Sequence, residues 1–189
     1  MIFHPTPIEG LVLVELEKRG DERGYFARFF CEEEFAAAGL NTTWEQANVS
    51  LTAEAGTVRG FHYQLPPSTE DKYLRCTRGA LWDVGVDLRK GSPTYGQSWG
   101  VELTQDNGLG LVLSKGIAHA FMTLVDETEA TYLVSSAFAP TLERGLRHDD
   151  PALAVDWPRK AAVVSDKDAA WPDFGPETAI DLAATPQEA

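Results

Sequence analysis

The feature that most constrains the fold is a series of short segments in which apolar and polar residues alternate, each bounded by turn-forming residues. In the clearest one, residues 81–88, apolar side chains alternate with Asp83, Gly85 and Asp87. Successive side chains of a β-strand point to opposite faces, so this alternation predicts a strand with one apolar face. Many short strands separated by turns such as Asp106-Asn107-Gly108 predict an all-β fold, an antiparallel barrel or sandwich, rather than a parallel α/β sheet.

The remaining elements extend this pattern over most of the chain. A short helix is expected at residues 32–39, because this segment is rich in Ala and Glu and ends at a glycine. Prolines make the chain irregular after Pro140, and we expect this part to wrap over the barrel. Residues 1–189 are predicted to form one domain, with a loose acidic tail over about residues 176–189. Further strands are expected at residues 11–16, 25–30, 44–51, 73–77, 99–103, 110–113, 120–125 and 130–135.

Net charge narrows the range of partners. The formal net charge is −13, with 16 Lys and Arg against 29 Asp and Glu, which argues against nucleic acid or an anionic membrane as a partner. An anionic small substrate would require the basic residues to gather at one site. The two cysteines form no CxxC motif, so neither a disulfide framework nor a zinc knuckle is expected. With no signal peptide and no apolar run of membrane-spanning length, the sequence predicts a cytoplasmic protein.

The segment from residue 56 to residue 67 is expected to form a strand that carries polar side chains suited to binding a ligand. On a regular strand, His62 would share a face with Gly60 and Gln64, whereas Arg59 would point to the opposite face. A small and a polar neighbour leave open space in front of the imidazole, which suits a ligand. The alternative is a buried histidine with one satisfied hydrogen bond, a common state for this residue type.

A second histidine lies in a motif of its own. Residues 114–121 form a glycine-containing turn that leads to a strand with His119 near its start, and this arrangement resembles the second signature of the cupin barrels. Metal-binding cupins carry two histidines separated by one residue in their first signature, but the second residue after His62 is Gln64. Metal sites need a defined number and geometry of ligands, so neither a metal nor another cofactor is expected. The site would then work by acid–base chemistry.

Other polar and aromatic residues fall on shared strand faces. Gln46 and Asn48 are two residues apart, and Tyr132 and Phe138 are six apart, so each pair shares a face if its strand is regular. Asp168 ends a charged run over residues 165–168. Each feature also has a plainer interpretation: a polar strand face, a core tyrosine with a bonded hydroxyl, and a solvated turn.

Taken together and in order, these motifs resemble those of the dTDP-4-dehydrorhamnose 3,5-epimerases over about residues 3–170. The resemblance implies a cupin-type jelly-roll barrel with short peripheral helices, assembled as a homodimer. It implies a nucleotide-diphosphate 4-keto-6-deoxy sugar as substrate, with dTDP as the nucleotide. The matching motifs are Asp21-x-Arg23-Gly24-x-Phe26, Gln46-x-Asn48-x-Ser50, Gly56-x-x-Arg59-Gly60-x-His62-Tyr63-Gln64-x-Pro66-Pro67, Lys72, Asp83-Val84-x-Val86-Asp87-x-Arg89-x-Gly91-Ser92-Pro93-Thr94-x-Gly96, Gly116-x-x-His119-x-Phe121, Tyr132, Glu143, Asp150-Pro151 and Ser165-Asp166-Lys167-Asp168.

The resemblance also implies a role for each catalytic residue. A C4 ketone acidifies the hydrogens at C3 and C5, so a base can remove one, an enolate forms, and an acid reprotonates the opposite face. His62 is expected to be the base, with Asp168 orienting its ring, and Tyr132 is expected to be the acid. Lys72 would stabilise the enolate oxygen. The activity implied is an isomerase that inverts C3, C5 or both in deoxysugar biosynthesis.

Ten further residues match substrate-binding positions of the family, and two of them depart from its usual pattern. Arg28 stands where the family usually has a glutamate that contacts the base, and Phe138 stands where it usually has a tyrosine that stacks near the nucleotide. An arginine cannot accept a hydrogen bond from a pyrimidine N–H, whereas a phenyl ring still stacks. Nucleotide recognition and the number of carbons inverted therefore stay open, and a variant 3- or 5-epimerase is an alternative. The expected substrate-binding residues are Arg23, Phe26, Arg28, Gln46, Asn48, Arg59, His119, Phe138, Glu143 and Lys167.

Two other classes of protein share this fold and stay open as alternatives. A metal-dependent cupin oxygenase would need the second histidine that the first signature lacks. A non-catalytic nucleotide-sugar-binding barrel would not need the set of His62, Tyr132, Lys72 and Asp168.

Overall fold

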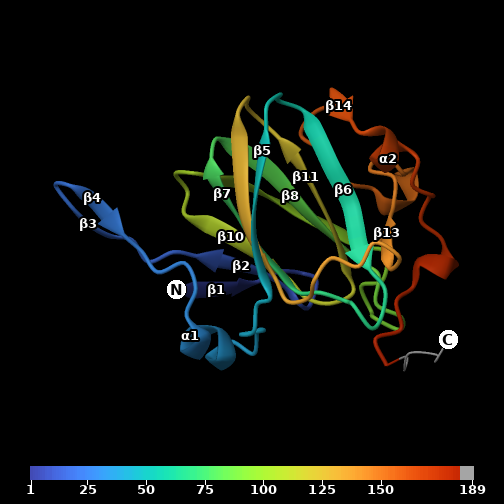
Figure 1. The fold of residues 1–189 in the computed structure, drawn as a ribbon, viewed down its shortest axis with the longest axis horizontal. Helices are drawn as coiled ribbons and strands as arrows, with labels where there is room; N and C mark the ends of the chain where they lie inside the picture. The colour runs from blue at the N-terminus through green and yellow to red at the C-terminus, as the bar shows by residue number, and fades with distance from the viewer. Residues whose placement is uncertain (184–189) are drawn as a thin grey trace.

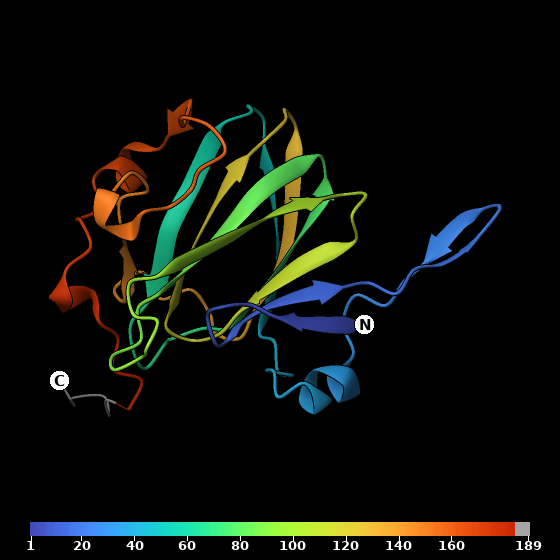
Figure 2. The same ribbon diagram turned by 180° about the vertical axis from the view of Figure 1, so that it is seen from behind.

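Two antiparallel β-sheets packed face to face form the body of the computed structural model, which describes residues 1–183 (Figures 1 and 2). The first sheet has the strand order β1 (Ile2–Pro5), β2 (Leu11–Glu15), β10 (Leu109–Leu113), β7 (Lys72–Arg78), β12 (Thr128–Val134) and β5 (Gln46–Thr52). The second has the order β13 (Glu143–Gly145), β6 (Thr57–Gln64), β11 (Ile117–Thr123), β8 (Ala80–Asp87) and β9 (Ser98–Thr104), and the short β14 (Val163–Val164) pairs with β6 in parallel. The predicted all-β, cupin-type jelly roll is confirmed.

Buried clusters cover both faces of the second sheet, one of them between the two sheets. Leu74 and Leu111 of the first sheet pack with Leu81 and Phe121 of the second in one buried cluster. On β8 the other set of side chains, including Val84, belongs to a separate cluster on the outer face of the second sheet. Both faces of β8 are therefore buried, and burial of each large apolar side chain contributes about 1.5–3 kcal/mol.

The segments at the two ends of the chain cover the outer faces of the sheets. Near the N-terminus, α1 (Glu32–Ala37) places Phe35 against Tyr73 and Val112 on the first sheet. The segment after Pro140, with η1 (Pro151–Leu153) and α2 (Asp166–Ala169), runs over the second sheet, as expected (Figure 1). Helix α1 is followed by Gly39 at a φ of +72°, a conformation that glycine adopts without strain.

The expected loose tail does not begin at residue 176. Residues 176–183 include η2 (Pro176–Thr178), and Ile180 is 2% exposed within the outer cluster of the second sheet. The backbone of Ile180 also bonds to Leu88 and Lys90. Composition alone did not predict this contact, because it depends on packing against a distant strand; residues 184–189 lie outside the described part of the chain.

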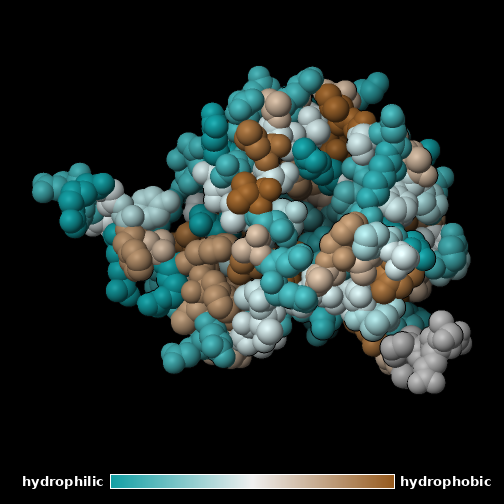
Figure 3. All heavy atoms as spheres, in the orientation of Figure 1, coloured by the Kyte–Doolittle hydropathy of each residue, from teal (hydrophilic) through white to brown (hydrophobic). Residues whose placement is uncertain are grey.

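The strand expected at residues 25–30 is much shorter in the structure. Only β4 (Gly24–Phe26) forms, and it pairs with β3 (Arg19–Asp21) in a separate hairpin that extends away from the sandwich (Figure 1). Phe29 and Phe30 leave the hairpin and pack against the first sheet, so the apolar run 29–30 belongs to a covering segment. In the space-filling view of the same side, the hairpin tip is hydrophilic (Figure 3).

No helix within residues 1–183 is long and apolar enough to cross a membrane.

Candidate active site

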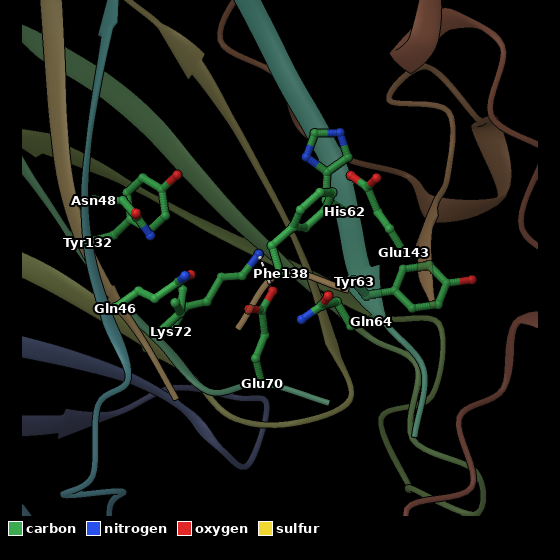
Figure 4. Close-up of a pocket in the computed structure, with 11 residues that line it drawn as sticks. Gln46, Asn48, His62, Tyr63, Gln64, Glu70, Lys72, Tyr132, Phe138 and Glu143 are labelled. Atoms are coloured by element: carbon green, nitrogen blue, oxygen red, sulfur yellow. Dashed lines mark ion pairs between the residues drawn. The ribbon is translucent and has the colours of Figure 1, made fainter. Parts of the chain in front are cut away.

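A cavity opens between the two sheets at the ends of β5, β6, β7 and β12. Its volume is about 290 Å³. Figure 4 shows Asn48 and Tyr132 on one side and His62 on the other, with Lys72 between them. A second cavity of about 190 Å³ adjoins it, because His62, Lys72 and Tyr132 line both. We call the first the outer cavity and the second the inner cavity. The sandwich therefore brings the expected base, acid and enolate stabiliser to one place.

His62 is held by a buried carboxylate. Its Nε2 lies 2.6 Å from Oδ1 of Asp168, which is 4% exposed and belongs to α2 of the wrapping segment. The second carboxylate oxygen accepts from the amide of Gly60 at 3.3 Å, and Ser165 caps the helix by accepting from the Asp168 amide. Burial acts to raise the pKa of Asp168, but the hydrogen bond and charge of His62 outweigh it and lower the pKa. Asp168 thus stays ionised, and the Nδ1 atom of His62 is left to act in the cavity.

On a regular strand Arg59 would point away from His62, but β6 is irregular and both side chains reach the same cavity. Along β6, Arg59 and His62 are three positions apart, but their partners on β11 are only two apart, so β6 carries one extra residue. The bulge lies at Gly60, whose φ is +115° and where a Cβ atom would come within 2.5 Å of the His119 carbonyl oxygen. Bulges re-aim side chains, and here Arg59 and His62 both line the inner cavity.

His119 lies on β11, directly opposite His62 on β6, and has a carboxylate partner of its own. Its Nε2 is 2.6 Å from Oδ1 of Asp83 on β8, and both side chains are buried. The inner cavity is completed by Ser50, Arg59, Leu74, His119, Phe121 and Asp168. The strand with His119 begins at Ile117, three residues before the expected start.

Tyr132 enters the cavity from β12, opposite His62. Burial raises the pKa of its hydroxyl; the nearby Glu70 carboxylate raises it further, while Arg59 acts to lower it. The hydroxyl therefore keeps its proton at neutral pH, which suits an acid rather than a base. Lys72, at the start of β7, forms an ion pair with Glu70, whose Oε1 lies 2.9 Å from Nζ.

The outer part of the cavity contains the expected recognition residues of the sandwich. Gln46 and Asn48 both line it from β5, and Phe138 lies at its edge in the loop after β12. Glu143 lines it from β13, with its carboxylate 2.7 Å from Nζ of Lys167. Lys167 therefore reaches the cavity only through Glu143.

Three expected substrate-binding residues lie away from this cavity. Arg23 and Phe26 belong to the β3–β4 hairpin, where Arg23 pairs with Asp21. Arg28 follows the hairpin and contacts Glu34 of α1 at 3.3 Å. The hairpin extends from the body in both views, so one copy of the chain does not bring these side chains to His62 (Figures 1 and 2).

Three residues of the site had no assigned role in the sequence. Glu70 pairs with Lys72, Asp83 pairs with His119, and Gln64 connects the two loops at the cavity edge through bonds to the Ser68 carbonyl and the Ala139 amide. The spacing of Glu70 and Lys72, two residues apart at the start of a strand, is a signal that could have identified the first pair.

The site residues do not gather into a metal-binding group. Across residues 1–183, no three His, Cys, Asp or Glu side chains lie close enough together to hold an ion. His62 and His119 each direct one ring nitrogen at a carboxylate of their own.

Comparison with known proteins identifies the family. A sequence profile of the dTDP-4-dehydrorhamnose 3,5-epimerases matches residues 5–175. The chain is 44% identical to dTDP-4-dehydrorhamnose 3,5-epimerase of Sinorhizobium fredii, over 92% of this chain and 90% of the relative. It is 40% identical to dTDP-4-dehydrorhamnose 3-epimerase of Streptomyces niveus, over 89% of this chain and 81% of the relative.

A solved structure agrees with this assignment. The dTDP-6-deoxy-D-glucose-3,5-epimerase of Legionella pneumophila, in complex with dTDP-4-keto-L-rhamnose, is 33% identical and superposes with a TM-score of 0.89, over 97% of this chain and 99% of that chain. Sequence, fold and site geometry lead to one conclusion: the chain belongs to the dTDP-4-dehydrorhamnose 3,5-epimerase family of isomerases.

Proposed function

We propose that this epimerase inverts C3, C5 or both in a dTDP-linked 4-keto-6-deoxyhexose, with His62 as base and Tyr132 as acid. The observation that carries the proposal is that these two side chains line both adjoining cavities from opposite strands, with Lys72 between them. A keto sugar held between them would lose a proton on one face to give a planar enolate, which would regain a proton on the other face. Relatives named for dTDP-4-dehydrorhamnose support the substrate class.

The proton transfers follow from the contacts of His62. With Nε2–H donated to Asp168, the neutral imidazole has a free lone pair on Nδ1. Nδ1 takes the proton from the carbon next to the ketone. The C–H electron pair forms a double bond to C4, and the C4 carbonyl π electrons move onto its oxygen to give the enolate. The ionised Asp168 stabilises the imidazolium, and the Lys72 ammonium stabilises the negative oxygen on C4.

Tyr132 completes the inversion by returning a proton to the opposite face. Its raised pKa keeps it protonated until the enolate forms. Tyrosinate and imidazolium then exchange protons with solvent, so the enzyme returns to its starting state and the sugar keeps its atoms.

The nucleotide would occupy the outer cavity and its edge. Gln46 and Asn48 offer donors and acceptors there, and Phe138 offers a ring for stacking. Arg59 suits an anionic group, since a guanidinium can bind a phosphate by paired hydrogen bonds.

A homodimer would complete this site. The β3–β4 hairpin carries Arg23 and Phe26 away from the body, and Phe26 is 66% exposed. A second copy would give the hairpin a surface to cover and could bring its residues to a neighbouring cavity. The oligomeric state in sedimentation velocity, with and without residues 19–26, tests this expectation.

Solvent-deuterium labelling tests the proposed reaction. The protein is incubated in D2O with dTDP-4-keto-6-deoxyglucose, and NMR locates the deuterium. Label at C3, C5 or both is expected, with inversion at the labelled carbon. His62→Ala should abolish both wash-in and inversion, because no proton leaves carbon. Normal wash-in by His62→Ala, or no wash-in by the wild-type protein, would contradict the proposal.

A further inference from the structure

Glu70 lies beside the proposed catalytic groups, although no sequence motif assigns it a role. Its carboxylate is 2.9 Å from the ammonium of Lys72, and the two side chains are only 12% and 15% exposed. Both line the outer cavity, and Figure 4 shows the pair below His62 and Tyr132. Solvent and salt screen the attraction between two such enclosed charges much less than that of a surface ion pair.

Each of the other carboxylates at the site has a different side chain as its partner. Asp168 holds His62, Asp83 holds His119, and Glu143 binds Lys167. In the described part of the chain, Glu70 is the carboxylate that forms an ion pair with Lys72. His62, His119, Lys167 and Lys72 are thus each held by a carboxylate of their own.

The backbone around Glu70 is fixed on both sides. Before it, the side chain of Gln64 donates to the Ser68 carbonyl at 3.1 Å. After it, the Asp71 amide donates to the Ser135 hydroxyl at 2.7 Å, and the Ser135 amide donates to the Asp71 carbonyl at 3.0 Å. Glu70 is therefore a fixed anchor, whereas Lys72 has a long flexible side chain.

We infer that Glu70 is a positioning residue that holds the Lys72 ammonium at the oxygen on C4 of the substrate. An ammonium has three N–H donors, so a bond to Glu70 leaves two for the enolate oxygen. Without the acceptor, the lysine would adopt other rotamers, and the preorganised stabilisation of the enolate would fall. This inference rests on the proposed function.

The charges around Lys72 agree with this role. His62 and Tyr132 share both cavities with Lys72, and Arg59 and His119 line the inner one. When His62 is protonated, it and Arg59 add positive charge to the cavity that Lys72 lines, and the Glu70 carboxylate offsets their repulsion of the ammonium. Glu70 also acts, after burial, to raise the pKa of Tyr132, which favours the protonated acid.

Two variants of similar length separate the roles of Glu70. Glu70→Gln keeps a carbonyl acceptor for the ammonium, whereas Glu70→Met removes it. We expect Glu70→Met to lower kcat about tenfold with KM changed less than about threefold, since a misplaced donor loses part of the 10²–10³-fold that such a group supplies. Glu70→Gln should recover most of kcat. Glu70→Ala, which also lacks an acceptor, should resemble Glu70→Met.

Glu45→Gln is the charge-matched control. Glu45 is exposed, accepts from the Ala137 amide at 2.9 Å, and does not line either cavity. Its variant should keep the wild-type kcat. Melting temperatures of all variants check that the fold is intact.

The outcomes separate this inference from the proposed function. Unchanged kcat in both Glu70→Met and Glu70→Ala, a loss confined to KM, or a Glu70→Gln variant as slow as Glu70→Met would each overturn the positioning role. No deuterium wash-in by the wild-type protein would overturn the proposed function, and with it this inference. Wash-in that is normal in the wild type and tenfold slower only in the variants without an acceptor would support it.

Discussion

Replacing Asp168 by asparagine removes the charge that holds His62 and leaves the shape of the site nearly intact. The carboxylate is buried and 2.6 Å from Nε2, so this hydrogen bond is short and shielded from solvent. A hydrogen bond to a charged group contributes about 1.5–3 kcal/mol. Each 1.36 kcal/mol corresponds to a factor of ten in rate, so kcat should fall by about 10- to 10²-fold.

The loss should appear in kcat rather than in KM, because Asp168 acts on the imidazolium that forms during the reaction. The amide oxygen of asparagine can still accept from Gly60, so the bulge in β6 should persist. The assay is the initial rate of deuterium wash-in, with the stereochemistry of the product from NMR. Asp166→Asn is the matched control, since Asp166 lies on the same short helix, is exposed and does not line the inner cavity.

A loss below about threefold in Asp168→Asn would refute the reasoning, since it would mean that the base needs no charged partner. An equal loss in Asp166→Asn would point to the helix as a whole. A rise in KM at constant kcat would instead assign Asp168 to substrate binding.

Four further outcomes test other parts of the site and fold. Tyr132→Phe should still wash in deuterium with retention while inversion falls about 10²–10⁴-fold, and near-normal inversion would leave another group as the acid. Activity should survive exhaustive chelation; turnover lost with EDTA and restored by one divalent metal would contradict acid–base catalysis without metal. Arg28→Glu and Phe138→Tyr, alone and together, should lower the Kd for dTDP in titration calorimetry, and unchanged affinities would argue against a recognition role. Burial opposes ionisation of Asp87, but hydrogen bonds led by that from Arg89 outweigh it and lower its pKa from 3.8 to about 2. A lowered pKa stabilises the fold above the unfolded value, so about 2 kcal/mol of unfolding free energy should disappear between about pH 5 and pH 2, and Asp87→Asn should flatten this slope in urea titrations.

Residues on regular strands were predictable from the sequence, because an alternation of two defines their faces. Gln46 and Asn48 share the cavity face of β5, and Tyr132 faces the cavity from the adjacent strand, as expected. Arg59, expected at the site although a regular strand would turn it away, lines the inner cavity because one extra residue in β6 reverses the alternation. The glycine at position 60 is the sequence signal for that bulge, because glycine adopts the positive φ that the structure shows there without strain.

Contacts between distant segments were harder to predict. Asp83 appeared only as a polar position on β8, and its bond to His119 requires the pairing of β8 with β11. Ile180 was expected in a loose tail, but it packs on the far side of the second sheet. Arg23 and Phe26 lie on a hairpin away from the cavity, and alternation within one chain cannot indicate whether a second copy would bring them to a site.

The distribution of charge at the site bears on how an acidic protein can bind an anionic substrate. The sequence required basic residues to gather at one place, and the structure does bring Arg59, Lys72 and two histidines together. Lys72 is paired with Glu70, so its positive charge is largely offset, and the two histidines each direct a ring nitrogen at a carboxylate. Arg59 instead donates to the neutral hydroxyl of Thr52 at 3.0 Å, and no ion pair involves it in the described part of the chain. The net attraction for a diphosphate would therefore come mainly from Arg59, with the arginine of a partner hairpin as the second source.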